Sequence, residues 1–511
     1  MLEITIILGV QMSRPVIGRV ADETSLAKAV IKLNRSSDVR PLELLITETE
    51  GGVRILLRVV EVRSINPYLN PRSLDVEEKT GVSASPFEWT SASLMPGVYR
   101  LAEVEVVDCY REEGGQIHPI GRVRAPSPGA PVYRADHSVV RAILGRTTCP
   151  LLIGYLAGTD GVPFELDANI FMRHALIIGN PGTGKSFLLG VLLEELQRYR
   201  ARVVNFDPLD EYSLTVEDLG GVNLIVGRDY MPRLDVLSEG EFAALIEAHV
   251  PTDFQRAIAR EGFRSWRQAS LSAERMTRRP LEPDRLLHYV EEAAERMRAS
   301  DETRMNTLER LRFLLESLRI VGTGGRDLST LIENNRLVNI TFRGADETQI
   351  TFSVASILRE ILSLRTAERV GNLLISADEA HLLVPSGRSN PPSRGVIKRI
   401  MRYGRHFGIG VVLLTQLPAS LDQEVVSLPS LRIIFATSPE QIRGISHILA
   451  DLPKNVLQDL PRLERGTAIV TGARDLVRHS VYVRIRSDRK SRHGAPTPPL
   501  VETRLQESMP R

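Results

Sequence analysis

The sequence predicts an α/β protein in three parts: a small N-terminal β-barrel, an α/β core, and a helical insertion within that core. Residues 1–140 are rich in strand-forming segments, and residues 150–230 and 335–486 alternate strand and helix patterns. Residues 235–330 carry many helix formers and few strand signals. We expect residues 487–511, with their closely spaced prolines, to be a tail that is poorly ordered where it begins and packs later.

Length and composition fit an ordinary globular protein with two to four domains, because 42% of the 511 residues are hydrophobic and 25% are charged. Two cysteines, Cys109 and Cys149, are too few for a disulfide framework or a four-ligand zinc site. The first residues lack the pattern of a signal peptide, and no stretch approaches the ~18 apolar residues of a membrane span. We therefore expect a cytoplasmic protein with no membrane partner.

The charge is distributed unevenly along the chain. Residues 391–511 carry 19 Lys and Arg against 10 Asp and Glu, whereas the preceding residues carry 46 against 53. A basic C-terminal part is compatible with a polyanionic partner, with a solvated surface, and with a subunit contact.

The barrel is predicted from segments rich in Val, Ile, Leu and Thr. These segments are residues 2–10, 42–48, 53–62 and 99–107. Gly51-Gly52 separates the second from the third as a hairpin turn, and the Pro- and Gly-rich residues 125–131 read as a connector or a domain edge. Short strands separated by turn signals are typical of a small barrel.

A phosphate-binding loop is the strongest functional signal in the chain. It fits G-x-x-x-x-G-K-[ST] at every position and reads Gly179-Asn180-Pro181-Gly182-Thr183-Gly184-Lys185-Ser186. An apolar strand, residues 175–178, precedes it, and a helix pattern begins at Phe187. Backbone N–H groups in such a turn close around phosphate oxygens, and the helix N-terminus adds its positive dipole end. We expect residues 179–187 to bind ATP, with Lys185 on the terminal phosphates and Ser186 on Mg²⁺.

Two consecutive acids follow another apolar strand, residues 373–377. Asp378 is suited to hold Mg²⁺ through water, and Glu379 points differently and is suited to orient or deprotonate the attacking water. A strand that ends in Asp-Glu is common, but together with the phosphate loop this pair predicts hydrolysis rather than passive binding.

A third apolar strand, residues 409–414, ends at Thr415-Gln416. Polar residues at the carboxyl end of a parallel strand lie beside the ligand crevice. Gln416 is therefore placed to hydrogen-bond the γ-phosphate or the attacking water. The alternative is that this side chain only caps a loop.

A basic segment precedes that strand and contains Lys398, Arg399, Arg402, Arg405 and His406. An arginine offered to the γ-phosphate of a neighbouring subunit would stabilise the charge of the transition state. The alternative is that these side chains are solvated helix charges.

The chain resembles HerA-type ATPases, within the broader group that contains FtsK-like DNA translocases. The matching segments lie along essentially the whole chain: Arg173-His174, Asp207-Pro208, Glu211-Tyr212, Asp378-Glu379-Ala380-His381, Gly404-Arg405-His406-Phe407-Gly408, Thr415-Gln416-Leu417-Pro418, Leu460-Pro461-Arg462-Leu463 and Gly466-Thr467-Ala468-Ile469-Val470. Two positions depart from the family pattern. The segment 180–183 is closer to an AAA+ loop, and His406 stands where Lys is commoner.

This resemblance implies a RecA-like P-loop ATPase core with a HAS-type barrel, assembled as a hexameric ring around DNA with ATP at the subunit interfaces. It implies Arg405 as the arginine finger and a second ATP-site contact from Arg173. It also implies a role in DNA end processing with a NurA-type nuclease docked on the barrel.

We therefore predict an ATP-driven translocase or helicase that acts on duplex DNA, with or without single-stranded ends. Candidate DNA contacts are the loop at 319–326 and basic residues near the C-terminal strands. Two alternatives share the same motifs. One is an AAA+-like, conjugation or packaging motor, and the other is an ATP-dependent switch that locks an assembly without moving anything.

Overall fold

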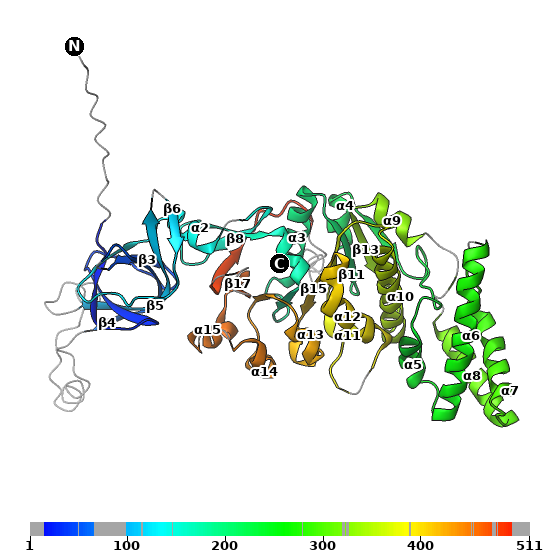
Figure 1. Cartoon of the computed structure of the whole chain (residues 1–511). Coiled ribbons are helices and arrows are strands. Elements are labelled where there is room, and N and C mark those ends of the chain that lie inside the picture. Colours follow the sequence, from blue (N-terminus) through cyan, green and yellow to red (C-terminus); the bar gives the residue numbers. More distant parts are fainter. Residues whose placement is uncertain are drawn as a thin grey trace, which may run out of the picture. The chain divides into compact units, whose positions relative to one another are not determined.

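The computed structural model describes residues 15–49, 51–65, 99–113, 116–145, 147–277, 279–318, 322, 327–387, 390–450, 452, 454–472, 477 and 479–492. The chain divides into two compact units (Figure 1). The first contains residues 1–146, 155–164 and 477–482, and the second contains the remainder. No helix among the described residues has the length and apolar character needed to cross a membrane.

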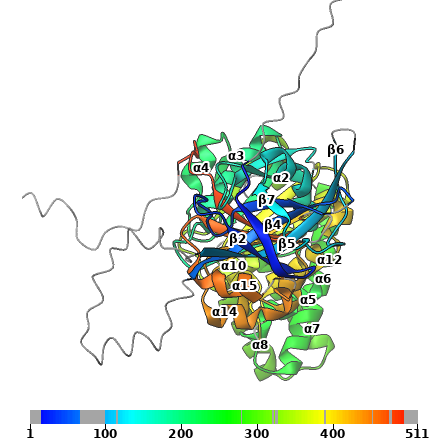
Figure 2. The same ribbon diagram turned by 90° about the vertical axis from the view of Figure 1, so that its left-hand side faces the viewer.

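The first unit is a closed barrel. Its strands are β1 (Gly18–Thr24), β2 (Lys28–Leu33), β3 (Leu44–Glu48), β4 (Arg54–Ile65), β5 (Tyr99–Glu113), β6 (Gln116–Pro119) and β7 (Pro131–Arg134). The sheet order is β2-β1-β7-β3-β4-β5-β6, and an additional β2–β5 pairing closes six of these strands into a ring (Figure 2). Alternate side chains of the strands fill the interior with Val, Ile and Leu, as the period-2 geometry of strands requires.

The structure revises two expectations for this unit and leaves a third untested. The predicted strand at residues 2–10 lies outside the described residues. Residues 125–131, expected as a connector, lie within the barrel instead, because Val20 N donates to Ala130 O at 3.0 Å and Pro131 begins β7. The strands β1, β2, β6 and β7 were not expected, because their short and partly charged sequences carry a weak strand signal.

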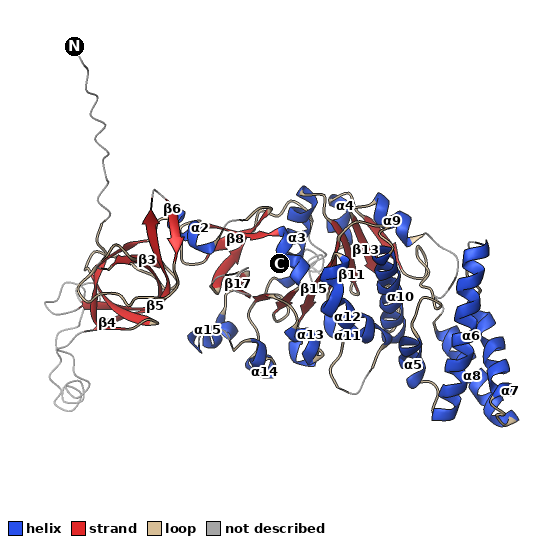
Figure 3. Ribbon diagram, in the orientation of Figure 1, coloured by secondary structure: helices blue, strands red, loops and turns tan. Residues whose placement is uncertain are grey.

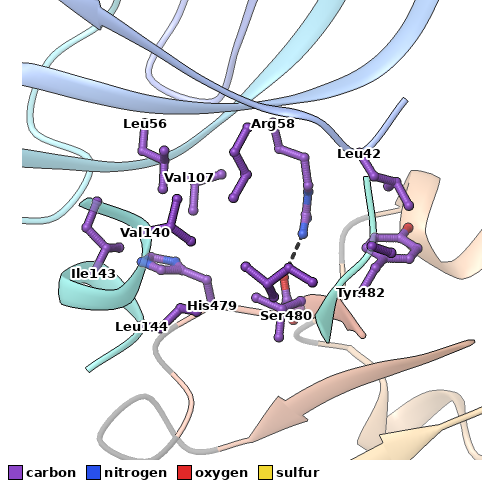
Figure 4. A pocket seen from close by; sticks show the side chains of 14 residues that line it. Leu42, Leu56, Arg58, Val107, Val140, Ile143, Leu144, His479, Ser480 and Tyr482 are labelled. Atoms are coloured by element: carbon purple, nitrogen blue, oxygen red, sulfur yellow. Dashed lines mark hydrogen bonds between the residues drawn. The ribbon is translucent and has the colours of Figure 1, made fainter. Parts of the chain in front are cut away.

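A hollow in the first unit is lined mainly by apolar side chains of the barrel, of α2 (His137–Leu144) and of residues 479–482 (Figure 4). Arg58 closes one side of it. The Arg58 guanidinium pairs with Glu105, lies 5.3 Å from the Tyr482 ring centroid, and donates from Nη1 to Ser480 O at 2.7 Å. These contacts hold a late segment of the chain against the barrel strands.

The second unit is built on an eleven-stranded sheet. Its strands are β8 (Pro150–Leu156), β9 (Pro163–Asp167), β10 (Ala175–Ile178), β11 (Arg202–Asp207), β12 (Val222–Ile225), β13 (Leu337–Thr341), β14 (Leu373–Ala377), β15 (Ile409–Thr415), β16 (Leu431–Ile434), β17 (Thr467–Gly472) and β18 (Val481–Ile485). The order is β12-β13-β11-β14-β15-β10-β16-β17-β18-β8-β9. The seven strands from β12 to β16 are parallel, and β17 pairs antiparallel with β16.

Helices cover both faces of this sheet (Figure 3). They are α3 (Lys185–Arg198), α4 (Ser213–Asp218), α9 (Leu328–Asn334), α10 (Glu347–Thr366), α11 (Ala380–Leu383), α12 (Pro392–Tyr403), α13 (Gln423–Ser427), α14 (Pro439–Gly444) and α15 (Lys454–Asp459). Helix α3 joins β10 to β11 and α10 joins β13 to β14, and the two crossovers run in opposite directions along the sheet. Because such crossovers are right-handed, α3 and α10 cover opposite faces.

The helical insertion contains α5 (Glu239–Glu247), α6 (Asp253–Thr277), α7 (Leu286–Arg296) and α8 (Asp301–Ser317) (Figure 1). Helices α6 and α7 approach closely at Gly262, where an added Cβ would lie 2.5 Å from the Val290 Cα. On α8, Leu311 and Leu314 are buried, so this face of the helix belongs to a core. The predicted fold class, an α/β core with a small barrel and a helical insertion, is confirmed.

The tail departs from expectation where it begins. Residues 486–492 are not loose, because they hydrogen-bond to α3 and to α4. Acidic side chains on these two helices supply the acceptors, so a basic segment packs on them.

Candidate nucleotide site

The phosphate loop joins the buried strand β10 to α3, as predicted. Gly182 (φ 72°) and Gly184 (φ 122°) adopt backbone conformations that side chains disfavour. At Gly184 an added Cβ would also lie 3.2 Å from Phe435 Cε1, so this side chain would have to shift, and the positive φ alone already favours glycine. Gly184 is the N-cap of α3, so the first turn of this helix begins at Lys185.

The loop is held by hydrogen bonds from its own residues and from its neighbours. Asn180 O accepts bonds from Thr183 Oγ1 at 2.7 Å and from Lys185 Nζ at 3.1 Å. Asn180 N donates to Ala436 O at 2.8 Å, and Gly466 N donates to Thr183 O at 2.9 Å. The residue pairs that hold the loop therefore include one position just after β16 and one just before β17. Lys185 Nζ bonds to a backbone carbonyl, and phosphate oxygens of a bound nucleotide could take the place of that acceptor.

Lys185 is only 5% exposed, and burial lowers the pKa of its ammonium. The negative charges of Asp378, Glu379 and Glu211 act in the opposite direction. A partly desolvated cation among three carboxyl groups interacts strongly with any further anion, because charge effects grow as water is excluded.

Asp378 lies directly after β14 and is almost fully buried. Its Oδ2 accepts a 2.6 Å hydrogen bond from the Tyr212 hydroxyl, and its Oδ1 accepts one of 2.8 Å from Glu379 N. Burial raises the pKa of this carboxyl to about 6. The Ser186 side chain lies close enough to the Tyr212 hydroxyl to oppose the rise of its pKa, so this hydroxyl lies beside both predicted metal ligands.

Glu379 has a left-handed backbone conformation (φ 46°, ψ 45°), which costs a non-glycine residue about 1–3 kcal/mol and is often found at functional sites. Gln416 Nε2 donates to its Oε1, and His381 Nδ1 lies 3.2 Å from its Oε2. Burial raises the pKa of Glu379, but the hydrogen bonds from His381 and Gln416 and the charge of Lys185 outweigh it, so the pKa is lowered. The side chain is therefore an ionised acceptor at neutral pH.

Sheet order explains why these residues meet. β15 lies between β10 and β14, and Ile178 pairs with Thr415 in parallel register. The phosphate loop, Gln416 and the Asp378-Glu379 pair all follow carboxyl ends of adjacent strands, which is where ligands bind in open α/β sheets. The structure thus brings five predicted site residues to one edge: Lys185, Ser186, Asp378, Glu379 and Gln416.

Arg405 and Arg173 lie at the opposite edge of the same sheet. Arg405 is exposed in the 3-10 turn η4 (Gly404–Phe407), which precedes β15, and Arg173 ends the turn η2 (Ala168–Arg173), which precedes β10. The seven residues of β15 separate Arg405 from the carboxyl edge by roughly 20 Å. Neither arginine is brought to the phosphate loop of its own chain.

Contacts within the chain divide the basic segment before β15 into two groups. Lys398 Nζ lies 2.8 Å from Asp422 Oδ2, and Arg402 pairs with Glu424. Arg399 and Arg405 are exposed and form no ion pair within the part of the chain that the structure describes. Only this second group has its charge available to an anion from outside the chain.

Sequence reasoning gave no role to three residues that contact this site: Glu211, Tyr212 and His381. All three occur in the motifs that matched the HerA-type pattern, directly after a strand or after Glu379. Their positions after strands β11 and β14 could have predicted that they lie at the site, because the carboxyl ends of neighbouring parallel strands share an edge.

Sequence reasoning also missed a ladder of polar side chains buried across the strands. Ser376 Oγ donates to Asn205 Oδ1 at 2.6 Å, Asn205 Nδ2 donates to Asn339 Oδ1 at 2.8 Å, and Asn339 Nδ2 donates to Asp207 Oδ2 at 3.2 Å. Asp207 also accepts a 3.0 Å bond from Tyr212 N. A single asparagine within an apolar strand, as in β11 and β13, was the signal for this network.

Comparison with known proteins agrees with the motifs. Residues 151–361 match the family described as "Helicase HerA, central domain". A DNA double-strand break repair helicase HerA from Sulfurisphaera tokodaii is 26% identical over 381 residues, which cover 70% of this chain and 73% of that protein. The protein of the same name from Pyrococcus furiosus is 24% identical over 506 residues, which cover 89% and 90%.

Among solved structures, VirB4 of Thermoanaerobacter pseudethanolicus superposes with a TM-score of 0.53 at 16% identity. The match covers 67% of this chain and 98% of that chain. At this identity the likeness concerns the fold, which is that of a RecA-like core. The resemblance to HerA-type ATPases inferred from the motifs is confirmed by this family match and by these relatives, and the chain is a P-loop ATPase.

Proposed function

We propose that this protein is an ATP-driven translocase or helicase that acts on duplex DNA as a ring, in DNA end processing. The observation that carries the proposal is the division of the predicted ATP site between two edges of one sheet. The curated relatives, which are named DNA double-strand break repair helicases, support DNA as the substrate. A NurA-type nuclease partner and a hexameric ring remain part of this proposal on the strength of the motif resemblance.

The carboxyl edge supplies the groups that bind and activate. Lys185 and the loop N–H groups would hold the β- and γ-phosphates, because the loop glycines leave the backbone accessible. Glu379 would orient the attacking water and accept its proton, and the Gln416 amide fixes the position of that carboxylate.

Ser186 and Asp378 fit a Mg²⁺ site. The Tyr212 hydroxyl donates to Asp378 Oδ2 and also lies beside the Ser186 side chain, so both oxygens lie near one small group. Hydroxyl and carboxylate oxygens are the ligands that Mg²⁺ prefers, together with water and phosphate. When bound, Mg²⁺ neutralises charge that develops on the phosphate oxygens.

The amino edge would complete the site of another subunit. Arg405 cannot span the roughly 20 Å to its own phosphate loop, since an arginine side chain is far shorter than β15. In a ring, a head-to-tail contact places one edge of a subunit against the other edge of its neighbour. Arg405 is therefore proposed as the arginine finger, with Arg173 as a second residue at the same interface.

DNA would be gripped through its phosphates. The candidate loop at 319–326 lies, apart from residue 322, outside the described residues. Basic residues near the C-terminal strands remain candidates for this contact.

A combined sizing and hydrolysis experiment tests the proposal. Purified protein is measured by light scattering and by ATPase assay, with and without ATP and blunt duplex DNA. We expect a ring-sized species and hydrolysis that duplex DNA stimulates, both absent in Lys185→Ala. A monomer whose rate per molecule is independent of concentration and of DNA would contradict the proposal.

The same assay separates the alternatives. Stimulation by unfolded protein and not by duplex DNA would favour a protein-remodelling motor. Full function with hydrolysis blocked would favour a switch that only locks an assembly. A conjugation or packaging motor would share the stimulation by DNA, so a displacement assay on linear blunt ends would then be decisive.

A further inference from the structure

A short basic segment after β18 crosses both helices that flank the nucleotide site. This segment, residues 486–492, is here called the strap, and it belongs to the same compact unit as α3 and α4. The strap is not part of the sheet, because β18 pairs with β17 and β8 and ends before the strap begins. Strand pairing therefore does not determine where the strap runs.

The strap is anchored on α3 by a buried carboxylate. Glu194 Oε1 accepts hydrogen bonds from Lys490 N at 2.8 Å, from Ser491 N at 2.6 Å and from Ser491 Oγ at 2.7 Å. Its other oxygen lies 2.8 Å from Arg486 Nη2. Glu194 is 9% exposed, and a carboxylate with four donors at such a site is a strong fixed anchor.

The other end of the strap is anchored on α4. Arg492 Nη2 lies 2.8 Å from Asp218 Oδ1, and Arg492 N donates to Asp218 Oδ2 at 2.6 Å. Thr215 Oγ1 donates to Arg492 O at 2.8 Å. The strap therefore bonds to both helices and fixes their spacing.

Arg489 lies between the two anchors and against the phosphate-loop helix. Its guanidinium carbon is 5.5 Å from the Phe187 ring centroid, and Phe187 is in the first turn of α3. An added Cβ at Gly190 would lie 2.1 Å from Arg489 Cζ, so α3 has a glycine where the guanidinium packs. Glycine inside a helix is less favourable than alanine, and this contact explains its presence here.

Polar contacts fix the orientation of Arg489. Its Nε donates to Ser491 Oγ at 2.9 Å, and its Nη2 donates to Arg492 O at 2.9 Å and to Thr215 Oγ1. The side chain is thus bonded to the strap and to α4 while it packs on α3.

We infer that the strap is a brace of the nucleotide site and that Arg489 is its positioning residue. Helix α3 begins at Lys185 and Ser186, and α4 begins directly after Tyr212, whose hydroxyl bonds to Asp378. A brace between these helices fixes the first-turn N–H groups of α3 relative to Asp378. This inference rests on the proposed function, because it concerns the same ATP site.

Steady-state ATP hydrolysis by Arg489→Ala tests the inference in the full-length protein. Small displacements of binding groups have large kinetic effects, so we expect KM for ATP to rise roughly tenfold. Loss of folded protein would lower kcat and leave KM unchanged, so the two effects are separable. Lys490→Ala is the matched control, because it removes one positive charge from the strap at an exposed side chain.

A double-mutant cycle sharpens the test. Gly190→Ala should raise KM in the wild-type background, because its methyl group meets the guanidinium. In the Arg489→Ala background the same change should have little effect, since the space is then open. Additive effects of the two substitutions, or an unchanged KM in Arg489→Ala, would overturn the inference.

Failure of the proposed function gives a different result. If the wild-type protein hydrolyses no ATP, the translocase proposal fails, while the dissociation constant of a fluorescent ATP analogue still tests the strap. A constant that is equal in wild type, Arg489→Ala and Gly190→Ala would then overturn the brace independently.

Discussion

The two edges of the parallel sheet contrast in how their charged groups are satisfied. At the carboxyl edge, Asp378, Glu379 and Lys185 are nearly buried and hydrogen-bond to their own chain. At the amino edge, Arg405 is exposed and forms no ion pair among the described residues, and the same holds for Arg399 on α12. One edge holds its charged groups in fixed hydrogen bonds, and the other leaves a cation exposed at the surface of the chain.

This difference explains why a single chain holds only part of the predicted site. Groups on the carboxyl edge gain their geometry from adjacent strands, whereas cations on the amino edge are about one strand length away. A phosphoryl-transfer site that lacks its arginine is slow by several orders of magnitude. Hydrolysis therefore becomes dependent on assembly if the two edges meet between subunits.

The largest expected effect comes from removing the exposed cation. Arg405→Ala should lower kcat about 10³-fold or more, because a finger arginine stabilises charge in the transition state. ATP affinity should change little, since the phosphate loop is intact. The measurement is steady-state hydrolysis together with equilibrium binding of an ATP analogue.

Arg402→Ala is the control for that prediction, because Arg402 is paired with Glu424 in its own chain. Mixing Arg405→Ala with Glu379→Gln protein gives a second test, since mixed rings can contain one intact interface. Equal losses in Arg402→Ala and Arg405→Ala would remove the distinction between paired and exposed cations.

The next largest effect concerns the carboxyl edge. Glu379→Gln should lower kcat about 10²- to 10⁴-fold, because the side chain can no longer accept a proton, while ATP binding persists. Ring size in the presence of ATP should match wild type. Duplex displacement measured in parallel should stop, and undiminished displacement would favour a switch over a motor. Glu464→Gln, at an exposed glutamate, controls for the loss of one negative charge.

The third prediction concerns the pH dependence of stability that follows from the pKa of Asp378. Burial raises the pKa of Asp378 to about 6, above the value of 3.8 for a solvated carboxyl. The folded state thus binds more protons than the unfolded state between pH 4 and 6. The unfolding free energy of the ligand-free protein falls as pH rises through this window, by about 1.4 kcal/mol per unit for this group.

Mg²⁺-ATP should respond in the opposite direction, because a metal ligand must be ionised. Its affinity should increase up to about tenfold per pH unit from pH 5 to 6 and then level off. Calorimetry over this range is the measurement, with ATP alone as the reference. Asp378→Asn should remove the Mg²⁺-dependent part, and Arg405→Ala should retain it.

Local patterns in the sequence predicted the core of the site. Lys185, Asp378 and Gln416 each follow an apolar strand, and the common edge of parallel strands brings them together without any further information. The strands of the core were equally clear, because buried parallel strands read as continuous apolar runs.

Long-range contacts could not be predicted in the same way. The pairing of Lys398 and Arg402 depends on Asp422 and Glu424, which approach only when the chain has folded. The β2–β5 pairing that closes the barrel and the path of the strap also depend on contacts between segments that are distant in the sequence. None of these features leaves a periodicity in the sequence, because each joins segments with no fixed spacing.

The smallest expected effect tests whether the buried asparagines stiffen the carboxyl edge. Asn339→Ala leaves Asn205 and Asp207 each without one partner in a dry environment, which should lower stability by about 1–3 kcal/mol. Asn306→Ala, at an exposed position in the insertion, should have no comparable effect. Thermal unfolding with and without Mg²⁺-ATP is the measurement. Because Asp207 also accepts a bond from Tyr212 N, the stabilisation by Mg²⁺-ATP should shrink in Asn339→Ala, whereas Arg399→Ala, at an exposed position of α12, should leave it unchanged.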